Sequence, residues 1–388
     1  MHHLKKVNDI PLTHAMLPRA ASPGASLPAA APASEQPADT LDTARGVLFP
    51  NEILGEIWKH ILLPPPAPRR SCLGEHEALR RVSQRFKDMS NQRWPVIESR
   101  ILDGAIENFM RTPSHQFSDV DQIHLNAILA RTKTLYLDKI PFGTDADKQS
   151  KLIDLLSRAP NIEKLSLENC RLNDVALRKI FDVVRIGGLK SLTELRLNDN
   201  RLTMLPEQLF DLTALTGLWL AGNQITVLPE RIGDLAALTD LNLMYNRLTT
   251  LPERLFDLPA LTKLYLTRNH LSVLSGRIGD LATLTELWLT GNQLASVPEQ
   301  IGDLKALREL GLGSNQLTTL PERMAELKAL KELWLGGNQL TTLPEWLGHL
   351  AALRVLSIRK NPLGPIPQWI LDMKMPPRNL MVQTDIPL

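Results

Sequence analysis

Cysteine is scarce in this sequence, because only Cys72 and Cys170 occur among 388 residues. Two cysteines do not make a disulfide framework, so we expect the protein to fold without oxidation. Long apolar runs are missing as well. No stretch of 18 or more apolar residues occurs, so the sequence predicts neither a transmembrane helix nor insertion into a membrane.

An excess of charge of one sign is also missing. Lysine and arginine total 44 residues, and aspartate and glutamate total 42, for a net charge of +2. Polybasic nucleic-acid binders are lopsided in charge, so we expect no nucleic acid among the partners. The nine histidines show no metal-ligand spacing, and no phosphate-binding or dinucleotide-binding fingerprint occurs. The sequence therefore predicts no metal, no cofactor and no catalytic residue.

Leucine, in contrast, is abundant and recurs with a fixed period. Around each of eight asparagines the residues follow LxxLxLxxNxL, and the second half of each unit follows LPExIGDLxAL with small variations. Upstream, Ile162, Leu165 and Leu167 continue this register in a longer unit of about 30 residues, with Cys170 in the asparagine position. Repeats with a period of 20 to 29 residues indicate a solenoid, here of about ten coils. The asparagines, each 23 residues after the last, are Asn200, Asn223, Asn246, Asn269, Asn292, Asn315, Asn338 and Asn361.

Each part of the repeat has a physical interpretation. The Leu-x-Leu segment predicts a short strand with inward leucines and one outward residue, and stacked strands would form a parallel sheet. We expect the asparagine amide to satisfy backbone groups of neighbouring coils, and Cys170 to be buried and inert. The Thr-Leu-Pro-Glu segments, such as residues 250–253, predict a capping box that opens a return helix. Ser275 and Gly276 interrupt this segment in one unit, where we expect a looser structure.

The outward strand position is informative because the fold does not dictate it. The strand position two residues before the outward one is acidic in most repeats, and Tyr245 lies close to the outward position of its own repeat. Aromatic anchors with a polar rim resemble interface hot spots, so we predict a target protein or peptide with apolar and some basic groups. Alternatively, the rings only pack against one another along the sheet, as the adjacent Tyr265 and Trp288 could. The predicted binding residues are Arg196, Trp219, Asn242, Tyr245, Tyr265, Trp288 and Trp334.

The repeat consensus resembles the leucine-rich repeats of plant intracellular Ras-group proteins and of type III effectors from plant-pathogenic bacteria. The resemblance implies an α/β fold, in which a parallel concave sheet is backed by a short helical convex side. It also implies a binding protein rather than an enzyme, and we expect a monomer.

A second resemblance concerns the residues before the repeats. The pattern from Leu48 to Ile57, followed by Leu79, Val82 and Phe86, resembles an F-box. An F-box implies docking to a Skp1-type adaptor of a ubiquitin ligase, so the chain would be a non-catalytic adaptor that recruits a target. The alternative is a scaffold or inhibitor that sequesters a partner, with the helical unit only a cap. The expected docking residues are Leu48, Pro50, Ile53, Leu54, Ile57, Leu79, Val82 and Phe86.

These features predict five segments: a disordered leader at 1–45, an F-box-like all-α unit at 46–110, a linker and N-terminal repeat cap at 111–160, the repeats at 161–363, and a C-terminal cap at 364–388. The leader is rich in Ala, Pro and Ser, which is compatible with a secretion leader. The expectation is therefore secretion by a bacterium into a host cell, where the protein would act in virulence. The alternative is a cytoplasmic protein.

Overall fold

The computed structural model describes residues 105–106, 109–111, 119–182, 189–376 and 379–386. All described residues belong to one unit of the chain, residues 57–388. The expected leader and all eight expected docking residues of the F-box-like unit lie outside the described residues.

A single parallel sheet of eleven strands runs through the described part of the chain, in sequence order from β1 to β11. Each strand from β2 to β10 pairs with the strands of the coils before and after it, and the central leucines of these strands align, as in Leu218, Leu241 and Leu264. The solenoid expected from the 23-residue period is thereby confirmed. The strands are β1 (Thr134–Tyr136), β2 (Lys164–Ser166), β3 (Glu194–Arg196), β4 (Gly217–Trp219), β5 (Asp240–Asn242), β6 (Lys263–Tyr265), β7 (Glu286–Trp288), β8 (Glu309–Gly311), β9 (Glu332–Trp334), β10 (Val355–Ser357) and β11 (Met381–Gln383).

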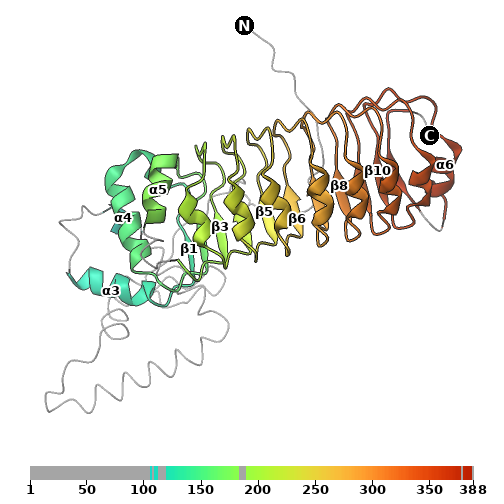
Figure 1. Ribbon diagram of the computed structural model, residues 1–388. Helices are drawn as coiled ribbons and strands as arrows, with labels where there is room; N and C mark the ends of the chain where they lie inside the picture. Colours follow the sequence, from blue (N-terminus) through green and yellow to red (C-terminus); the bar gives the residue numbers. More distant parts are fainter. Residues whose placement is uncertain (1–104, 107–108, 112–118, 183–188, 377–378, 387–388) are drawn as a thin grey trace, which may run out of the picture. The chain divides into compact units, whose positions relative to one another are not determined.

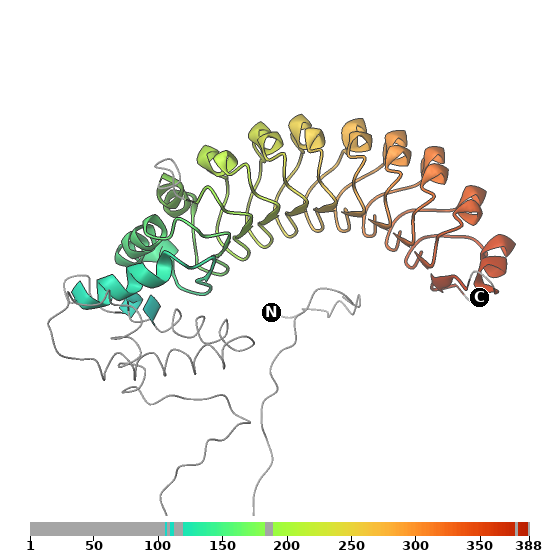
Figure 2. The same cartoon turned by 90° about the horizontal axis from the view of Figure 1, so that it is seen from below.

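Helical elements form the opposite side of the coils. Figure 2 shows the strands along the inner side of the arc of coils and the helices and turns along its outer side. The α-helices are α3 (Asp119–Leu129), α4 (Ala146–Ser157), α5 (Asp174–Asp182) and α6 (Gln368–Lys374). The 3-10 helices are η2 (Phe142–Thr144), η4 (Glu207–Asp211), η5 (Glu230–Asp234), η6 (Glu253–Asp257), η7 (Gly276–Asp280), η8 (Glu299–Asp303), η9 (Glu322–Glu326) and η10 (Glu345–His349).

The return segments differ from the expected capped helices. In the 23-residue units they are single 3-10 turns of five residues, because so few residues separate the proline from the next buried leucine. Pro252 itself occupies the N-cap position with extended backbone and no side-chain cap, so the predicted capping box at Thr250 does not form. The Ser275–Gly276 unit keeps the same turn, and the Ser275 hydroxyl accepts a hydrogen bond from the Arg277 N–H. The expected looser structure is therefore not observed, because the Ser275 cap stabilises the turn.

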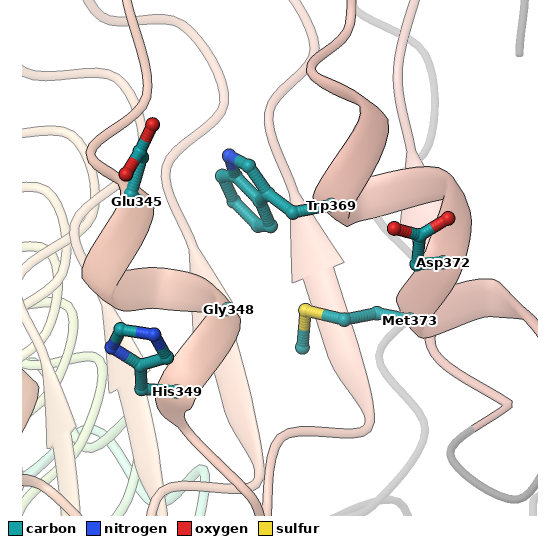
Figure 3. Close-up of a pocket in the computed structure, with 6 residues that line it drawn as sticks. All are labelled: Glu345, Gly348, His349, Trp369, Asp372 and Met373. Carbon is teal, nitrogen blue, oxygen red and sulfur yellow. The ribbon is translucent and has the colours of Figure 1, made fainter.

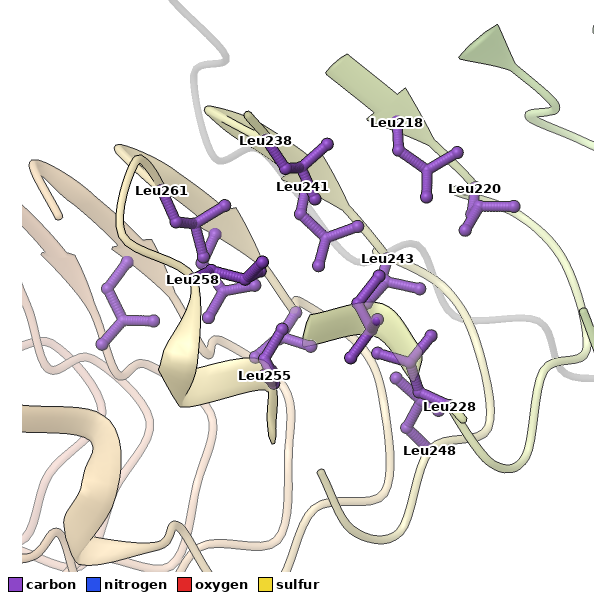
Figure 4. Close-up of a cluster of buried hydrophobic side chains, with 14 of the residues drawn as sticks. Leu218, Leu220, Leu228, Leu238, Leu241, Leu243, Leu248, Leu255, Leu258 and Leu261 are labelled. Atoms are coloured by element: carbon purple, nitrogen blue, oxygen red, sulfur yellow. The ribbon is translucent and has the colours of Figure 1, made fainter. Parts of the chain in front are cut away.

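The core is a continuous column of leucines between the sheet and the outer turns. Figure 4 shows leucines of three successive coils meeting there, and those on the strands, such as Leu241 and Leu243, are fully buried. A buried leucine contributes roughly 1.5–3 kcal/mol relative to an exposed one. In a solenoid this gain depends on the next coil, because no coil encloses its own leucines.

The constant 23-residue spacing of the asparagines produces a hydrogen-bonded ladder between coils. The Nδ2 group of Asn269 donates to the Leu243 carbonyl of the preceding coil (2.9 Å) and to Leu266 of its own coil (3.0 Å). Its Oδ1 atom accepts from the Leu248 N–H of the preceding coil (3.0 Å). Cys170 is fully buried in the same position, and its thiol donates to the Leu137 carbonyl (3.1 Å). The expected asparagine contacts with neighbouring coils and the expected burial of Cys170 are thereby confirmed.

A second ladder, of ion pairs, follows the outer turns. Arg231 contacts Asp211 of the preceding turn (2.8 Å) and Asp234 of its own (2.9 Å). Arg254 continues the series by contacting Asp234 (2.9 Å). Hydrogen bonds from Arg231 hold the pKa of Asp234 below its ordinary value. The ladder joins neighbouring coils on the side opposite the sheet.

Candidate functional site

The predicted strand residues occupy one row on the inner face. Across adjacent strands, Arg196 pairs with Trp219, which pairs with Asn242. The row continues in register through Tyr265 and Trp288. Then follow Gly311 and Trp334. All of these side chains except the buried Gly311 are half-buried, so none points into the leucine core. Three tryptophans and a tyrosine therefore lie on one surface and remain partly accessible.

Trp219 lies flat over its own strand and beneath an arginine. A Cβ atom on Gly217 would come within 2.1 Å of the Trp219 ring, so only glycine leaves room for this ring position. The Arg196 guanidinium lies 5.0 Å from the ring centroid, within the range of a cation–π interaction. Glu194 holds the same guanidinium from the side at 3.7 Å. This arginine is thus placed between an aromatic face and a carboxylate.

Trp288 and Trp334 meet across the intervening strand. Their ring centroids are 6.3 Å apart, with 36° between the ring planes. They can meet because β8 presents Gly311, where a Cβ atom would come within 2.5 Å of the Trp288 ring. The packing alternative had paired the adjacent Tyr265 and Trp288, whereas the observed ring contact joins residues two strands apart.

The flanking row supplies negative charge. Glu286, Glu309 and Glu332 stand at equivalent positions of three adjacent strands, each half-buried. The Tyr265 hydroxyl donates to Glu286 Oε2 (2.5 Å), and Trp334 Nε1 donates to Glu332 Oε2 (3.3 Å). Partial burial, and then the Glu286 carboxylate, raise the pKa of Tyr265 above its ordinary value. Tyr265 therefore stays neutral and acts as a hydrogen-bond donor.

Two predicted residues have local roles that the sequence did not indicate. The Asn242 side-chain oxygen accepts from the Met244 N–H (3.1 Å) and so stabilises the turn after β5. Tyr245 lies in that turn with a φ of 55°, is 53% exposed, and has the Arg268 guanidinium 5.6 Å from its ring centroid. Tyr245 is thus at the edge of the inner face rather than in the row itself.

Sequence reasoning missed how small the residues are at the two positions that follow the buried leucine after β7, β8 and β9. In the coils of β5 and β6 the equivalent positions include larger groups, namely Met244, Tyr245 and Arg268, whereas the coil of β4 has Ala221 and Gly222. The signal was available in the sequence, because glycine occurs at four of the six positions. These positions are Thr290, Gly291, Gly313, Ser314, Gly336 and Gly337.

A shallow groove lies at the end of the repeats, between η10 and α6. Figure 3 shows Glu345 and His349 on one side and Trp369, Asp372 and Met373 on the other. The Trp369 ring packs against this turn, and a Cβ atom added to Gly348 would meet the ring at 3.4 Å, an ordinary van der Waals contact. Within the described ranges, no group of three histidine, cysteine, aspartate or glutamate residues has a geometry suited to a metal ion. The groove thus offers no metal site.

Cys170, the cysteine that the structure describes, lies in an environment that disfavours the thiolate, which is the nucleophilic form. Burial raises the pKa of its thiol to about 12, so the thiolate is almost absent at neutral pH. Cys72 lies outside the described residues. The described part of the chain also holds no helix that is both long enough and apolar enough to cross a membrane.

Comparison with known proteins identifies the repeat. A family model described as Leucine rich repeat matches residues 190–248, 236–294 and 298–363. No curated protein matches the chain. Among solved structures, the chain is similar to a leucine-rich-repeat protein of Leptospira interrogans, at 27% identity and a TM-score of 0.50. That match covers 68% of this chain and 75% of the other.

Two receptors also match. One is the leucine-rich-repeat ectodomain of the membrane receptor kinase GASSHO1/SCHENGEN3 from Arabidopsis thaliana, solved in complex with CASPARIAN STRIP INTEGRITY FACTOR 2. The identity is 27%, the TM-score is 0.54, and the match covers 68% of this chain and 33% of the receptor chain. The other is a TDR receptor, at 24% identity and a TM-score of 0.54, covering 66% of this chain and 48% of that one. The likeness to the TDR receptor shows the fold alone.

Proposed function

We propose, from the premise that residues 190–363 form leucine-rich repeats, that the chain binds a protein target on the inner face of its sheet. The observation that carries the proposal is the aromatic row. Trp219, Tyr265, Trp288 and Trp334 stand on one surface, are half-buried and are rimmed by carboxylates. Large aromatic anchors surrounded by polar groups have the composition of interface hot spots.

The solved relatives support a binding role. The GASSHO1/SCHENGEN3 ectodomain was solved in complex with another factor, and this chain shares its repeat. A solenoid also suits the role physically, because the sheet presents an extended row of side chains that the leucine core does not need.

The finer proposal is that the chain recruits this target to a ubiquitin ligase. Its support is the F-box-like pattern of Leu48, Pro50 and Leu79 and their neighbours, which would dock a Skp1-type adaptor. With it goes the proposal that the protein is an effector secreted by a bacterium into a host cell, or otherwise a cytoplasmic protein. The competing function is a scaffold or inhibitor that sequesters its partner.

The binding role is tested by photo-crosslinking the full chain in a host extract and comparing variants. Trp219→Ala combined with Trp288→Ala should abolish capture of the target, because it removes two anchors of the row. The matched control is Glu322→Ala, an exposed residue of an outer turn, which should leave capture unchanged.

The same double variant decides between binding and packing. Both rings lie outside the leucine core and are partly exposed, so we expect the chain to lose some unfolding free energy in urea but to remain folded in buffer. If both capture and folding are lost together, the rings serve to pack the sheet, and the aromatic row is not a binding surface.

The adaptor role has its own test, which is a pull-down with purified Skp1-type adaptor. The full chain should bind it, and Leu48→Ala combined with Pro50→Ala should abolish the binding. Failure of the unmodified chain to bind would instead favour the scaffold or inhibitor.

A further inference from the structure

We infer that a row of basic side chains along one edge of the sheet binds an extended, acidic segment of a partner protein. The row, called here the basic edge, lies at the start of three adjacent strands late in the repeats. The inference goes beyond the proposed function, because the aromatic row of the inner face takes no part in it. The residues of the basic edge are Arg308, Lys331 and Arg354.

The backbone holds these three residues side by side. Each directly precedes a strand, namely β8, β9 or β10. The Lys331 N–H donates to the Arg308 carbonyl (2.8 Å), and the Arg354 N–H donates to the Lys331 carbonyl (2.8 Å). Neighbouring strands lie about 4.8 Å apart, so the side chains leave the edge at about that interval. All three side chains are exposed.

The earlier coils show what the stacking of coils uses at this position. Five successive coils carry threonine there, and each hydroxyl donates to a backbone carbonyl of the preceding coil, as Thr262 does to Thr239 (3.0 Å). Arg354 donates instead to carbonyls of its own coil, those of Ala351 (3.2 Å) and Leu353 (3.1 Å). A basic residue thus replaces a hydroxyl that joins neighbouring coils. The five threonines are Thr193, Thr216, Thr239, Thr262 and Thr285.

The charges of the basic edge are not neutralised within the described part of the chain. On the outer turns, Arg231 and Arg277 each pair with an aspartate of the preceding turn and one of their own. Lys305, in a bend before β8, pairs with Glu326 (3.7 Å). The three side chains of the basic edge form no ion pair with a described carboxylate. Like charges on adjacent strands repel one another, so an external anion would stabilise this edge.

The narrowness of the basic edge favours a peptide over a nucleic acid or a lipid surface. Glu309 and Glu332 directly follow Arg308 and Lys331, so a row of carboxylates begins one residue away. Consecutive Cα atoms are about 3.8 Å apart. A ligand broad enough to cover both rows would bring its phosphates against these carboxylates. A single extended chain can follow the basic row alone.

The spacing of the row also predicts the pattern of the bound segment. Side chains on one face of an extended peptide recur every second residue, at intervals of about 6.8 Å. The three cations span two strand intervals, about 9.6 Å, and their long stems can adjust to the difference. We therefore expect an acidic residue at every second position of the segment.

The inference is tested with a fluorescein-labelled peptide of twelve residues in which glutamate alternates with serine. The full chain should bind this peptide in low salt, as measured by fluorescence anisotropy. Affinity should fall at least tenfold when glutamine replaces the glutamates, because the contact depends on charge. It should also fall as salt increases, since salt screens exposed charges.

Variants of the chain locate the contact. Arg308→Thr combined with Lys331→Thr and Arg354→Thr installs the residue that the earlier coils use, so the variant should fold and unfold in urea as the unmodified chain does. It should bind the peptide at least tenfold more weakly. The matched control removes three exposed positive charges outside the basic edge and should change affinity by less than twofold. Its substitutions are Arg178→Gln, Arg201→Gln and Arg247→Gln.

The outcomes separate this inference from the proposed function. Peptide binding that is lost in the threonine variant, and kept in both the control and Trp219→Ala with Trp288→Ala, supports the inference. No peptide binding, or equal loss in the two charge variants, would overturn it and leave the aromatic row as the binding surface. Binding that requires the two tryptophans would place the peptide on the inner face and would also overturn it.

Two further ligands test the choice of a peptide. They are an oligonucleotide of twelve thymidines and vesicles of phosphatidylcholine with phosphatidylserine. The threonine variant and the unmodified chain should treat each of them alike. If either ligand binds the unmodified chain and loses that binding in the threonine variant but not in the control, the basic edge serves a nucleic acid or a membrane, and the inference is wrong.

Discussion

The asparagine ladder allows the cost of one substitution to be worked out group by group. In Asn269→Ala, three hydrogen bonds disappear: two donated by Nδ2 and one accepted by Oδ1. The Leu243 carbonyl still receives Asn246 Nδ2 (3.1 Å), and the Leu266 carbonyl still receives Asn292 Nδ2 (3.0 Å). The Leu248 N–H, however, has no other partner among the described residues and lies in the buried interior.

The magnitude follows from this inventory. An orphaned buried donor costs about 1–3 kcal/mol, and each of the other two lost hydrogen bonds costs about 0.5–1.5 kcal/mol. We therefore expect Asn269→Ala to lower the free energy of unfolding by about 2–6 kcal/mol, a large share of a typical domain's stability of about 5–15 kcal/mol.

The matched control is Asn361→Ala at the end of the series. Asn361 makes equivalent bonds, accepting from the Leu340 N–H (3.1 Å), but it is only partly buried. Water can replace the lost amide there, so the expected cost is about 1 kcal/mol. Urea unfolding followed by far-ultraviolet circular dichroism and by tryptophan fluorescence measures both variants. Equal costs for the two, or a cost below about 1 kcal/mol for Asn269→Ala, would refute the reasoning.

Three further outcomes follow from contacts described above. Gly302→Ala would place a Cβ atom 2.1 Å from the Arg323 carbonyl oxygen, so it should lower the free energy of unfolding in urea by about 2–4 kcal/mol. In the control Gly276→Ala, the added Cβ atom would meet only the flexible end of the Gln300 side chain at 3.1 Å, so the change should stay below about 1 kcal/mol. Similar values for the two variants would contradict the steric argument. In a Cys72→Ser variant, the buried Cys170 should react with an aromatic disulfide reagent only after urea is added, and rapid reaction in buffer would show that the thiol is accessible. Because hydrogen bonds from Arg231 lower the folded-state pKa of Asp234, its contribution to stability is present above the ordinary aspartate pKa of about 3.9 and is lost as the pH falls through the lowered value. Asp234→Asn should therefore lose less unfolding free energy between pH 5 and about pH 2 than the unmodified chain. Parallel pH profiles of the two proteins would show that the Arg231–Asp234 ion pair does not contribute to stability.

The parts of the fold that repeat could be predicted from the sequence. A side chain that recurs every 23 residues must occupy equivalent places in stacked coils, so Leu218 and Leu241 could be placed in the core and Trp219 on the inner face. The same logic placed Cys170 in the asparagine position. Periodicity fixes which face a residue shares, because a strand alternates its side chains between two faces.

Contacts that depend on irregular positions could not be predicted in this way. Trp288 reaches Trp334 only because Gly311 stands between them, and nothing in the aromatic spacing alone indicated that glycine would be decisive. The 3-10 turns replaced the expected helices because chain length, rather than capping chemistry, limits the return segment. The ladder from Asp211 through Arg231 was missed although its signal was present, as arginine and aspartate also recur with the 23-residue period.

The asparagine ladder also gives the protein a direction of assembly. Asn246 binds the Ile225 N–H and the Leu220 carbonyl of the coil before it, and Asn269 does the same for the coil of Asn246. The backbone hydrogen bonds of each coil are thus completed by the asparagine of the next coil, which is synthesised later. During synthesis, the most recently made coil lacks these hydrogen bonds until the next coil is added and supplies them. If the coils fold in the order of their synthesis, only one coil at a time lacks the hydrogen bonds from a following asparagine.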